Sequence, residues 1–337
     1  MSVSAKEVHL VSRPVGEPVP EDFALVDTAL GSPADGQLLV RNDYLSVDPY
    51  MRGRMDEGDS YVPAYDLGAV MDGGAVGTVV ESASDEVPVG STVAHRAGWR
   101  THALLPAGAV EVVDTEEFGS AIYLGQFGPT GLTAYAALKY TAGVGEGDTV
   151  FISGAGGAVG SAAAAIAREL GASKVIGTAG GPEKAARLTG ELGYDVGIDY
   201  RAGDVEKELR EAAPDGIDVY LDNVGGDQLR AAIEVLNDHG RIAGVGAVSQ
   251  YNATEPVPGP DNLYQIVIKR LDFQGVMVLD HLDKMGEYRR FAADLVREGK
   301  LARTETFVDG VENAVDGFLS MMRGGNTGKM VVRLTGD

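Results

Sequence analysis

Cysteine is absent from this 337-residue chain, and its five histidines are scattered. Without a thiolate the chain can form neither a disulfide, nor a cysteine-ligated zinc site, nor a cysteine nucleophile. No two histidines stand in the H-x-x-x-H or H-E-x-x-H spacing that metal-binding helices use. The sequence therefore predicts no metal site, and it argues against an alcohol dehydrogenase that works through thiolate-bound zinc.

Long apolar runs are absent too. No stretch approaches the roughly 20 residues that span a bilayer, and the first residues, MSVSAK, lack the apolar core of a signal peptide. The hydrophobic share of 44% is that of an ordinary globular protein. We expect a cytoplasmic protein without a membrane partner, and the length predicts two domains.

Positive charge is scarce. The chain has 28 Lys and Arg against 50 Asp and Glu, a formal net charge of −22. Such a surface repels nucleic acid, so no nucleic-acid partner is expected. The acidic residues are dispersed along the chain, which suits a protein kept soluble in concentrated salt, where the Debye length is about 3 Å at 1 M. We expect a halophilic source, and the alternative is an acidic mesophilic enzyme.

Glycine, by contrast, is abundant, and residues 151–161 (FISGAGGAVGS) are the most informative stretch. An apolar strand, 149–152, leads into a glycine-rich turn and then a small-residue helix, 158–170. The turn contains Gly154 and the run Gly157, Ala158, Val159 and Gly160. This order presents a helix N-terminus to a pyrophosphate. A glycine-rich turn without a ligand is the alternative interpretation.

The pattern of elements divides the chain. Residues 1–125 contain short β segments between Gly, Pro and Asp turns. Residues 126–303 alternate strands and helices, which predicts a doubly wound parallel sheet. The remaining helix and strand cannot form a domain alone, so we expect 304–337 to return to the first domain. The fold class is thus α/β, with a β-rich domain (1–125 and 304–337) and a Rossmann domain (126–303). The expected strands are 7–10, 23–27, 37–46, 75–82, 92–95, 101–105, 110–113, 149–153, 174–178, 196–199, 217–222, 241–246, 272–279 and 329–334.

The end of the second Rossmann strand indicates the cofactor. An Asp or Glu there would bind the ribose hydroxyls of NAD. This chain has Thr178-Ala179-Gly180-Gly181 instead, so no acid repels a 2′-phosphate. Lys184 supplies a cation at the next helix start, and Tyr200 follows the third strand and could add a hydroxyl. The pattern favours NADP(H). Lys184 as a merely solvated helix residue is the alternative.

Two further strand ends and one loop carry polar or bulky side chains. Ligands of open α/β sheets sit beyond the carboxyl ends of the strands. Asn223 and Gly246 occupy such positions, and Tyr251 places a phenol near the reacting end. In the first domain, Asp-Pro starts a turn after residue 47, where Tyr50 and Met51 either face a cleft or pack into a structured loop.

Six motifs together resemble one family. They are 47–55 (VDPYMRGRM), 131–135 (GLTAY), 157–161 (GAVGS), 215–226 (DGIDVYLDNVGG), 246–252 (GAVSQYN) and 325–332 (GNTGKMVV). The resemblance is to the zinc-independent medium-chain dehydrogenases/reductases, in the branch of prostaglandin reductases, leukotriene hydroxydehydrogenases and alkenal double-bond reductases. It implies a GroES-like catalytic domain around an inserted Rossmann domain, without zinc, and a homodimer joined through an edge strand at 275–279.

The resemblance also implies residue roles. NADP(H) contacts would fall on Gly157 to Gly160, Lys184, Tyr200, Asn223, Val245, Gly246, Ser249, Tyr251, Val276, Met277, Val278 and Asn326. Tyr50, Met51 and Tyr264 would line the substrate cleft. One departure concerns the pocket: Pro129-Thr130 stands where the family usually has a Met that flanks the nicotinamide, which puts the substrate range in doubt.

The activity expected from these residues is NADPH-dependent reduction of the C=C bond of α,β-unsaturated ketones or aldehydes. Hydride would pass to the β-carbon, and Tyr251 and a cofactor ribose hydroxyl would donate to the carbonyl oxygen. The alternatives are a quinone oxidoreductase on the same scaffold and a module that binds NADPH without catalysis.

Overall fold

A computed structural model describes residues 2–58 and 60–334 of the chain. The described residues up to 124 form one compact unit together with those from 305 onward, and residues 125–304 form the other. The boundaries expected from the sequence lie one residue away at each junction.

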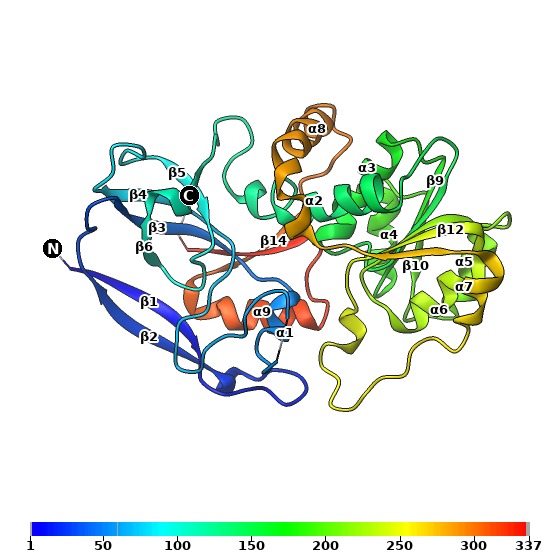
Figure 1. Cartoon of the computed structure of the whole chain (residues 1–337), viewed down its shortest axis with the longest axis horizontal. Helices are drawn as coiled ribbons and strands as arrows, with labels where there is room; N and C mark the ends of the chain where they lie inside the picture. Colours follow the sequence, from blue (N-terminus) through cyan, green and yellow to red (C-terminus); the bar gives the residue numbers. More distant parts are fainter. Residues whose placement is uncertain (1, 59, 335–337) are drawn as a thin grey trace. The chain divides into compact units, whose positions relative to one another are not determined.

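The second unit is built on a six-stranded parallel sheet (Figure 1). Its order, β10-β9-β8-β11-β12-β13, is the 3-2-1-4-5-6 order of a Rossmann fold, so the predicted fold class is confirmed. The strand order reverses between β8 and β11, which is where such sheets bind dinucleotides. The strands are β8 (Thr149–Ile152), β9 (Lys174–Ala179), β10 (Val196–Asp199), β11 (Ile217–Asp222), β12 (Leu236–Gly244) and β13 (Asp272–Gly275).

Several of the unit's helices bury apolar side chains, as amphipathic helices on a sheet do. One core cluster joins the sheet to the helices that follow β10 and β11, and in it the rings of Phe151 and Tyr220 stack with centroids 5.0 Å apart. On β8 itself, Phe151 and Ile152 are fully buried. The helices are α2 (Pro129–Ala136), which continues as a π-helical segment (Ala137–Thr141), α3 (Ala158–Glu169), α4 (Pro182–Glu191), α5 (Val205–Ala212), α6 (Gly226–Val235), α7 (Tyr264–Lys269) and α8 (Met285–Arg297).

The first unit contains a seven-stranded mixed sheet and a separate two-stranded sheet. The C-terminal β15 pairs antiparallel with β3, so the end of the chain adds strands to the N-terminal sheet. The two-stranded sheet joins β1 (Val3–Leu10) and β2 (Phe23–Leu30). The larger sheet contains β3 (Gln37–Ser46), β4 (Ala75–Ser82), β5 (Thr92–His95), β6 (His102–Pro106), β7 (Glu111–Val112), β14 (Glu305–Asp309) and β15 (Lys329–Arg333).

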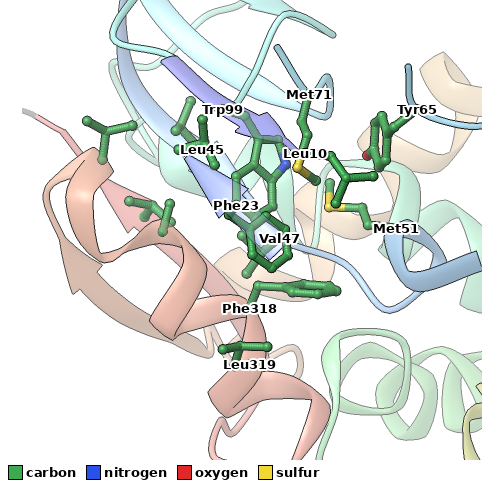
Figure 2. Close-up of a cluster of buried hydrophobic side chains, with 14 of the residues drawn as sticks. Leu10, Phe23, Leu45, Val47, Met51, Tyr65, Met71, Trp99, Phe318 and Leu319 are labelled. Atoms are coloured by element: carbon green, nitrogen blue, oxygen red, sulfur yellow. The ribbon is translucent and has the colours of Figure 1, made fainter. Parts of the chain in front are cut away.

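The core of the first unit is aromatic at its centre (Figure 2). Phe23 stacks on Trp99 with centroids 6.5 Å apart, and Phe318 meets both rings edge-on. Phe318 belongs to α9 (Ala314–Met322), the helix between β14 and β15. A short helix, α1 (Tyr50–Gly53), lies beside this core, and its Met51 is part of it.

The prediction of a strand over 272–279 is wrong in its second half. β13 ends at Gly275, and Val278–Lys284 is a 3-10 helix. The Val276 N–H still donates to the Gly244 carbonyl, but the Asp280 N–H donates to the Met277 carbonyl within the same segment. The expected edge strand at 275–279 is therefore not formed.

Candidate functional site

The glycine turn after β8 fits a phosphate. Gly154 has φ of +60°, which a residue with a side chain rarely adopts. A Cβ built on Gly160 would lie 2.5 Å from the Cα of Ala155, so only glycine lets α3 pack this closely on the turn. No side chain caps the N-terminus of α3, whose first N–H groups have no partner within the helix. The turn can therefore offer these donors to a pyrophosphate.

Asp222 joins this turn to the end of β11. Its Oδ1 accepts hydrogen bonds from the Tyr220 hydroxyl (2.7 Å), the Ser153 hydroxyl (3.1 Å) and the N–H groups of Val224 (2.9 Å) and Gly225 (2.8 Å). The side chain is buried, with 3% exposed. The buried carboxylate thus fixes the two loops that meet at the switch point. Asp222 was not among the predicted site residues, although an acid that ends an apolar strand was a usable signal.

Asn223 lies in the expected place. Its Nδ2 donates to the Ser153 carbonyl at 2.7 Å, and its N–H donates to the Ser153 hydroxyl at 2.9 Å. Asn223 therefore stands beside the glycine turn, at the carboxyl ends of the two central strands, where a cofactor ribose would lie.

The loop after β12 packs over the loop after β11. The N–H groups of Val245 and Gly246 both donate to the Asp222 carbonyl, and the Ser249 hydroxyl donates to the Val224 carbonyl at 2.6 Å. Each loop therefore holds the other in place. Ser249 uses its hydroxyl in this contact.

Tyr251 ends that loop. A Cβ built on Gly246 would lie 3.0 Å from the Tyr251 hydroxyl, so the phenol lies directly against the Gly246 backbone. Burial is the main cause that raises the pKa of Tyr251, and the Asp222 carboxylate adds to it, against a lowering backbone hydrogen bond at Ala247. The phenol therefore remains a hydrogen-bond donor at neutral pH.

The end of β9 is lined by cations and has no carboxylate on the strand. A Cβ at Gly180 would lie 2.9 Å from the Tyr200 hydroxyl and 3.0 Å from Arg201 Nε. Lys184 lies in the first turn of α4, and burial, then Arg201, then Arg187 lower its pKa. The structure thus gathers Lys184 and Tyr200 at the end of β9, together with Arg201, which was not predicted because it stands in an exposed turn.

The remaining expected contacts of this unit lie near its edge strand. Val276 is buried and its N–H bonds Gly244, whereas Met277 and Val278 lead into the 3-10 helix. Tyr264 opens α7 and is 73% exposed.

Two residues of the first unit, Tyr50 and Met51, were predicted to line a cleft, and for Met51 the structure corrects that prediction. Its side chain is fully buried in the core, next to Leu10 and Tyr65 in Figure 2, so it packs the loop and does not line a cleft. Tyr50 is only partly buried, and burial together with Asp48 raises the pKa of its phenol well above the usual value. Asn326 precedes β15, where its Nδ2 donates to the Gly328 carbonyl at 2.6 Å.

A buried lysine holds the loop that carries Tyr50. Lys329 is 1% exposed, and its Nζ donates to the Val47 carbonyl at 2.7 Å and lies 3.2 Å from Asp48 Oδ1. Burial lowers the pKa of Lys329, partly offset by Asp48. The sequence motif contained Lys329, but spacing alone gave it no partner.

Residues 2–58 and 60–334 contain no group of three His, Asp or Glu side chains placed to hold a metal ion. Over the same ranges, no helix combines the length and the apolar character that a membrane crossing needs.

Comparisons with known proteins agree with this architecture. Residues 6–113 match a family described as the N-terminal domain of oxidoreductase, and residues 158–297 match one described as zinc-binding dehydrogenase. The chain is 39% identical over 333 residues to an NADPH-dependent curcumin reductase of Escherichia coli, covering 97% of this chain and 96% of the relative. It is also 39% identical over 343 residues to prostaglandin reductase 1 of Bos taurus, covering 98% and 99% of the two chains.

A solved structure is similarly close. CurA of Vibrio vulnificus in complex with NADPH superposes with a TM-score of 0.93 at 38% identity, over 98% of this chain and 100% of that one. The glycine turn, the uncapped helix and the cations beside residues 178–181, a stretch without an acid of its own, fit the same cofactor. The chain thus belongs to the zinc-independent medium-chain dehydrogenases/reductases, in the prostaglandin and alkenal reductase branch, and is an NADP(H)-dependent oxidoreductase.

Proposed function

We propose that the protein reduces the C=C bond of α,β-unsaturated ketones and aldehydes with NADPH. The observation that carries the proposal is the Tyr251 phenol, held against Gly246 at the carboxyl end of β12 with a raised pKa. The names of two relatives, a curcumin reductase and a prostaglandin reductase, support it, since curcumin is a conjugated enone.

The chain's own residues would bind the substrate and polarise its carbonyl group. Bound NADPH would supply the hydride that adds to the β-carbon of the alkene. As that bond forms, the π electrons move onto the carbonyl oxygen as an enolate, and a fixed donor at that oxygen lowers the barrier. Tyr251 is the proposed donor, because its hydroxyl keeps its proton. The α-carbon would then take a proton from water.

Asp222 and Asn223 would act before this step. They fix the loops after β8, β11 and β12, so the donors are in place when substrate arrives. Lys184, Tyr200 and the glycine turn would anchor the phosphates. In the first unit we keep Tyr50 as a proposed substrate contact and assign Met51 to the core.

A substrate panel tests the proposal. The purified protein is assayed in molar salt with enones, enals and quinones, each with NADPH and with NADH, and products are identified by mass spectrometry. We expect saturated ketones and aldehydes, with NADPH preferred. Allylic alcohols, turnover of quinones alone, or NADPH binding without any turnover would each contradict the proposal.

We also propose that the second unit pairs with a second copy of the chain. No side chain of α7 is fully buried, although Ile266 packs against the core, and β13 is an edge strand. Around them Val267, Phe273 and Leu282 are 66%, 43% and 50% exposed. Exposed apolar side chains beside an open edge are a basis for association. A monomer mass in sedimentation equilibrium at micromolar concentration would refute this pairing.

A further inference from the structure

Gly180 follows β9 directly, and Tyr200 and Arg201 pack against it. In a Rossmann unit the acid that binds the ribose of NAD follows the second strand. Here the position is Gly180, and the Tyr200 hydroxyl and Arg201 Nε lie only 2.9 and 3.0 Å from where its Cβ would be, closer than a real Cβ tolerates, so both side chains pack directly on the Gly180 backbone. A cation and a hydroxyl therefore occupy the neighbourhood of the missing acid.

The backbone fixes where Arg201 begins. Asp199 Oδ1 accepts the N–H of Arg201 at 3.0 Å and the N–H of Gly181 at 2.7 Å. One carboxylate oxygen thus ties the turn after β10 to the start of α4. The guanidinium carbon of Arg201 lies 5.7 Å from the centre of the Tyr200 ring, a cation–π distance that orients both side chains.

The charged groups around Arg201 leave its guanidinium available to bind an anion. Among residues 2–58 and 60–334, Arg201 takes part in no ion pair. Its neighbour Arg187 is held by Glu191, with Nη2 at 2.7 Å and Nε at 3.0 Å from Oε2. Asp199 uses its Oδ1 on backbone N–H groups, and Glu183 lies in the first turn of α4.

The positive charges of Arg201 and Lys184 also interact. After burial, Arg201 is the largest cause that lowers the pKa of Lys184. Neighbouring like charges repel, and an anion bound beside both would offset that repulsion. A phosphate dianion suits both, since a guanidinium can bind two phosphate oxygens in one plane.

We propose that Arg201 is a second cation for the 2′-phosphate of NADP(H), acting with Lys184 and the Tyr200 hydroxyl beside Gly180. It makes Arg201 a specificity-determining residue for the cofactor. The proposal does not depend on which substrate is reduced.

Binding measurements separate this role from catalysis. Isothermal titration of the full chain with adenosine 2′,5′-bisphosphate and with 5′-AMP, at fixed salt, compares ligands that differ by the 2′-phosphate. Arg201→Gln should weaken the bisphosphate about 10- to 100-fold, as expected for loss of a charge-assisted pair, and change 5′-AMP less than about twofold. Arg201→Lys should recover part of the loss. In turnover, KM for NADPH should rise and KM for NADH should not.

Arg187→Gln is the matched control. It removes the same charge from the same neighbourhood, but from a guanidinium already bound to Glu191. We expect less than about a twofold change for either ligand. Equal weakening of both ligands by Arg201→Gln, or equal weakening of the bisphosphate by the two variants, would overturn the proposal. A circular dichroism melt of each variant verifies that it is folded.

Discussion

Tyr251 is the side chain whose loss should separate catalysis from binding. Tyr251→Phe removes the proposed donor and keeps the ring against Gly246. We expect kcat for an enone to fall about 10- to 100-fold, because one oxyanion donor is lost while the cofactor ribose hydroxyl remains. NADPH affinity, measured by the fluorescence of the bound cofactor, should change less than about threefold, since no phosphate contact is removed.

Tyr140→Phe is the control for this variant. That phenol lies in the π-helical segment Ala137–Thr141, where it donates to Glu287 at 3.0 Å and its ring stacks on His281. It should leave kcat unchanged. Enone turnover that survives Tyr251→Phe intact would reduce Tyr251 to a packing residue of the cofactor loop.

Single residues also show where sequence patterns stop. Asn223, Gly246 and Tyr251 were predicted because strand ends meet at one edge of a parallel sheet. Tyr50 and Met51 were predicted as a pair, yet adjacent side chains in a turn point in different directions, and only Met51 enters the core. Arg201 lay in an exposed, polar turn, and nothing in its spacing revealed its approach to Gly180.

Among the elements, the contact of α3 with the glycine turn offers the sharpest test. Gly160→Ala would place a methyl 2.6 Å from two backbone oxygens, those of Gly154 and Ala155, so the turn must move. We expect an unfolding free energy lower by about 1–3 kcal/mol. NADPH affinity should fall more than about tenfold, because the donors of the turn are displaced.

Gly190→Ala is the helical control. A Cβ at Gly190, in α4, meets no atom within 4 Å. The free energy of unfolding of that variant should rise by about 0.5–1 kcal/mol, because alanine reduces the conformational freedom of the unfolded chain. NADPH affinity should not fall. Urea unfolding and NADPH titration measure both. Unchanged NADPH affinity in Gly160→Ala would mean that the turn does not hold the cofactor.

Strand bounds were predictable where local signals were complete. β3, β4, β5, β10 and β11 begin and end at the predicted residues, since alternation or an apolar run meets a turn signal at each end. The first residues of β1 were missed because their strand character comes from pairing with distant β2, Val3 opposite Leu30. The end of β13 was missed because the apolar run 276–279 continues past the last paired residue.

For the whole chain, the composition carries a prediction that the fold leaves open. The net charge of −22 favours stabilisation by salt, and a halophilic source stays a prediction. Most ion pairs join exposed side chains. Salt screens such pairs, and each contributes little to the free energy of unfolding. Stability should therefore be compared at one fixed salt concentration whenever pH is varied.

At fixed salt, high pH should unfold the second unit. Tyr194, Tyr220 and Tyr288 are buried there, and burial raises the pKa of each phenol well above 10. Unfolded tyrosines ionise near pH 10. The folded state therefore binds more protons above that pH, and the stability that these phenols contribute is complete below pH 10 and falls as pH rises.

At pH 11 each phenol should lower the free energy of unfolding by about 1.4 kcal/mol, or by about 4 kcal/mol for the three. That is a large part of the stability of an ordinary domain. In the first unit Lys329 acts in the opposite sense, because its lowered pKa makes its contribution to stability grow with pH, but only up to about 10.5, where the unfolded lysine also loses its proton. The net slope above pH 10.5 is therefore negative. Urea midpoints between pH 8 and 11, with tyrosinate absorbance recorded alongside, measure it. Ionisation of these buried phenols near pH 10 in a chain that keeps its circular dichroism would show that they are open to solvent, and the predicted loss of stability would then be absent.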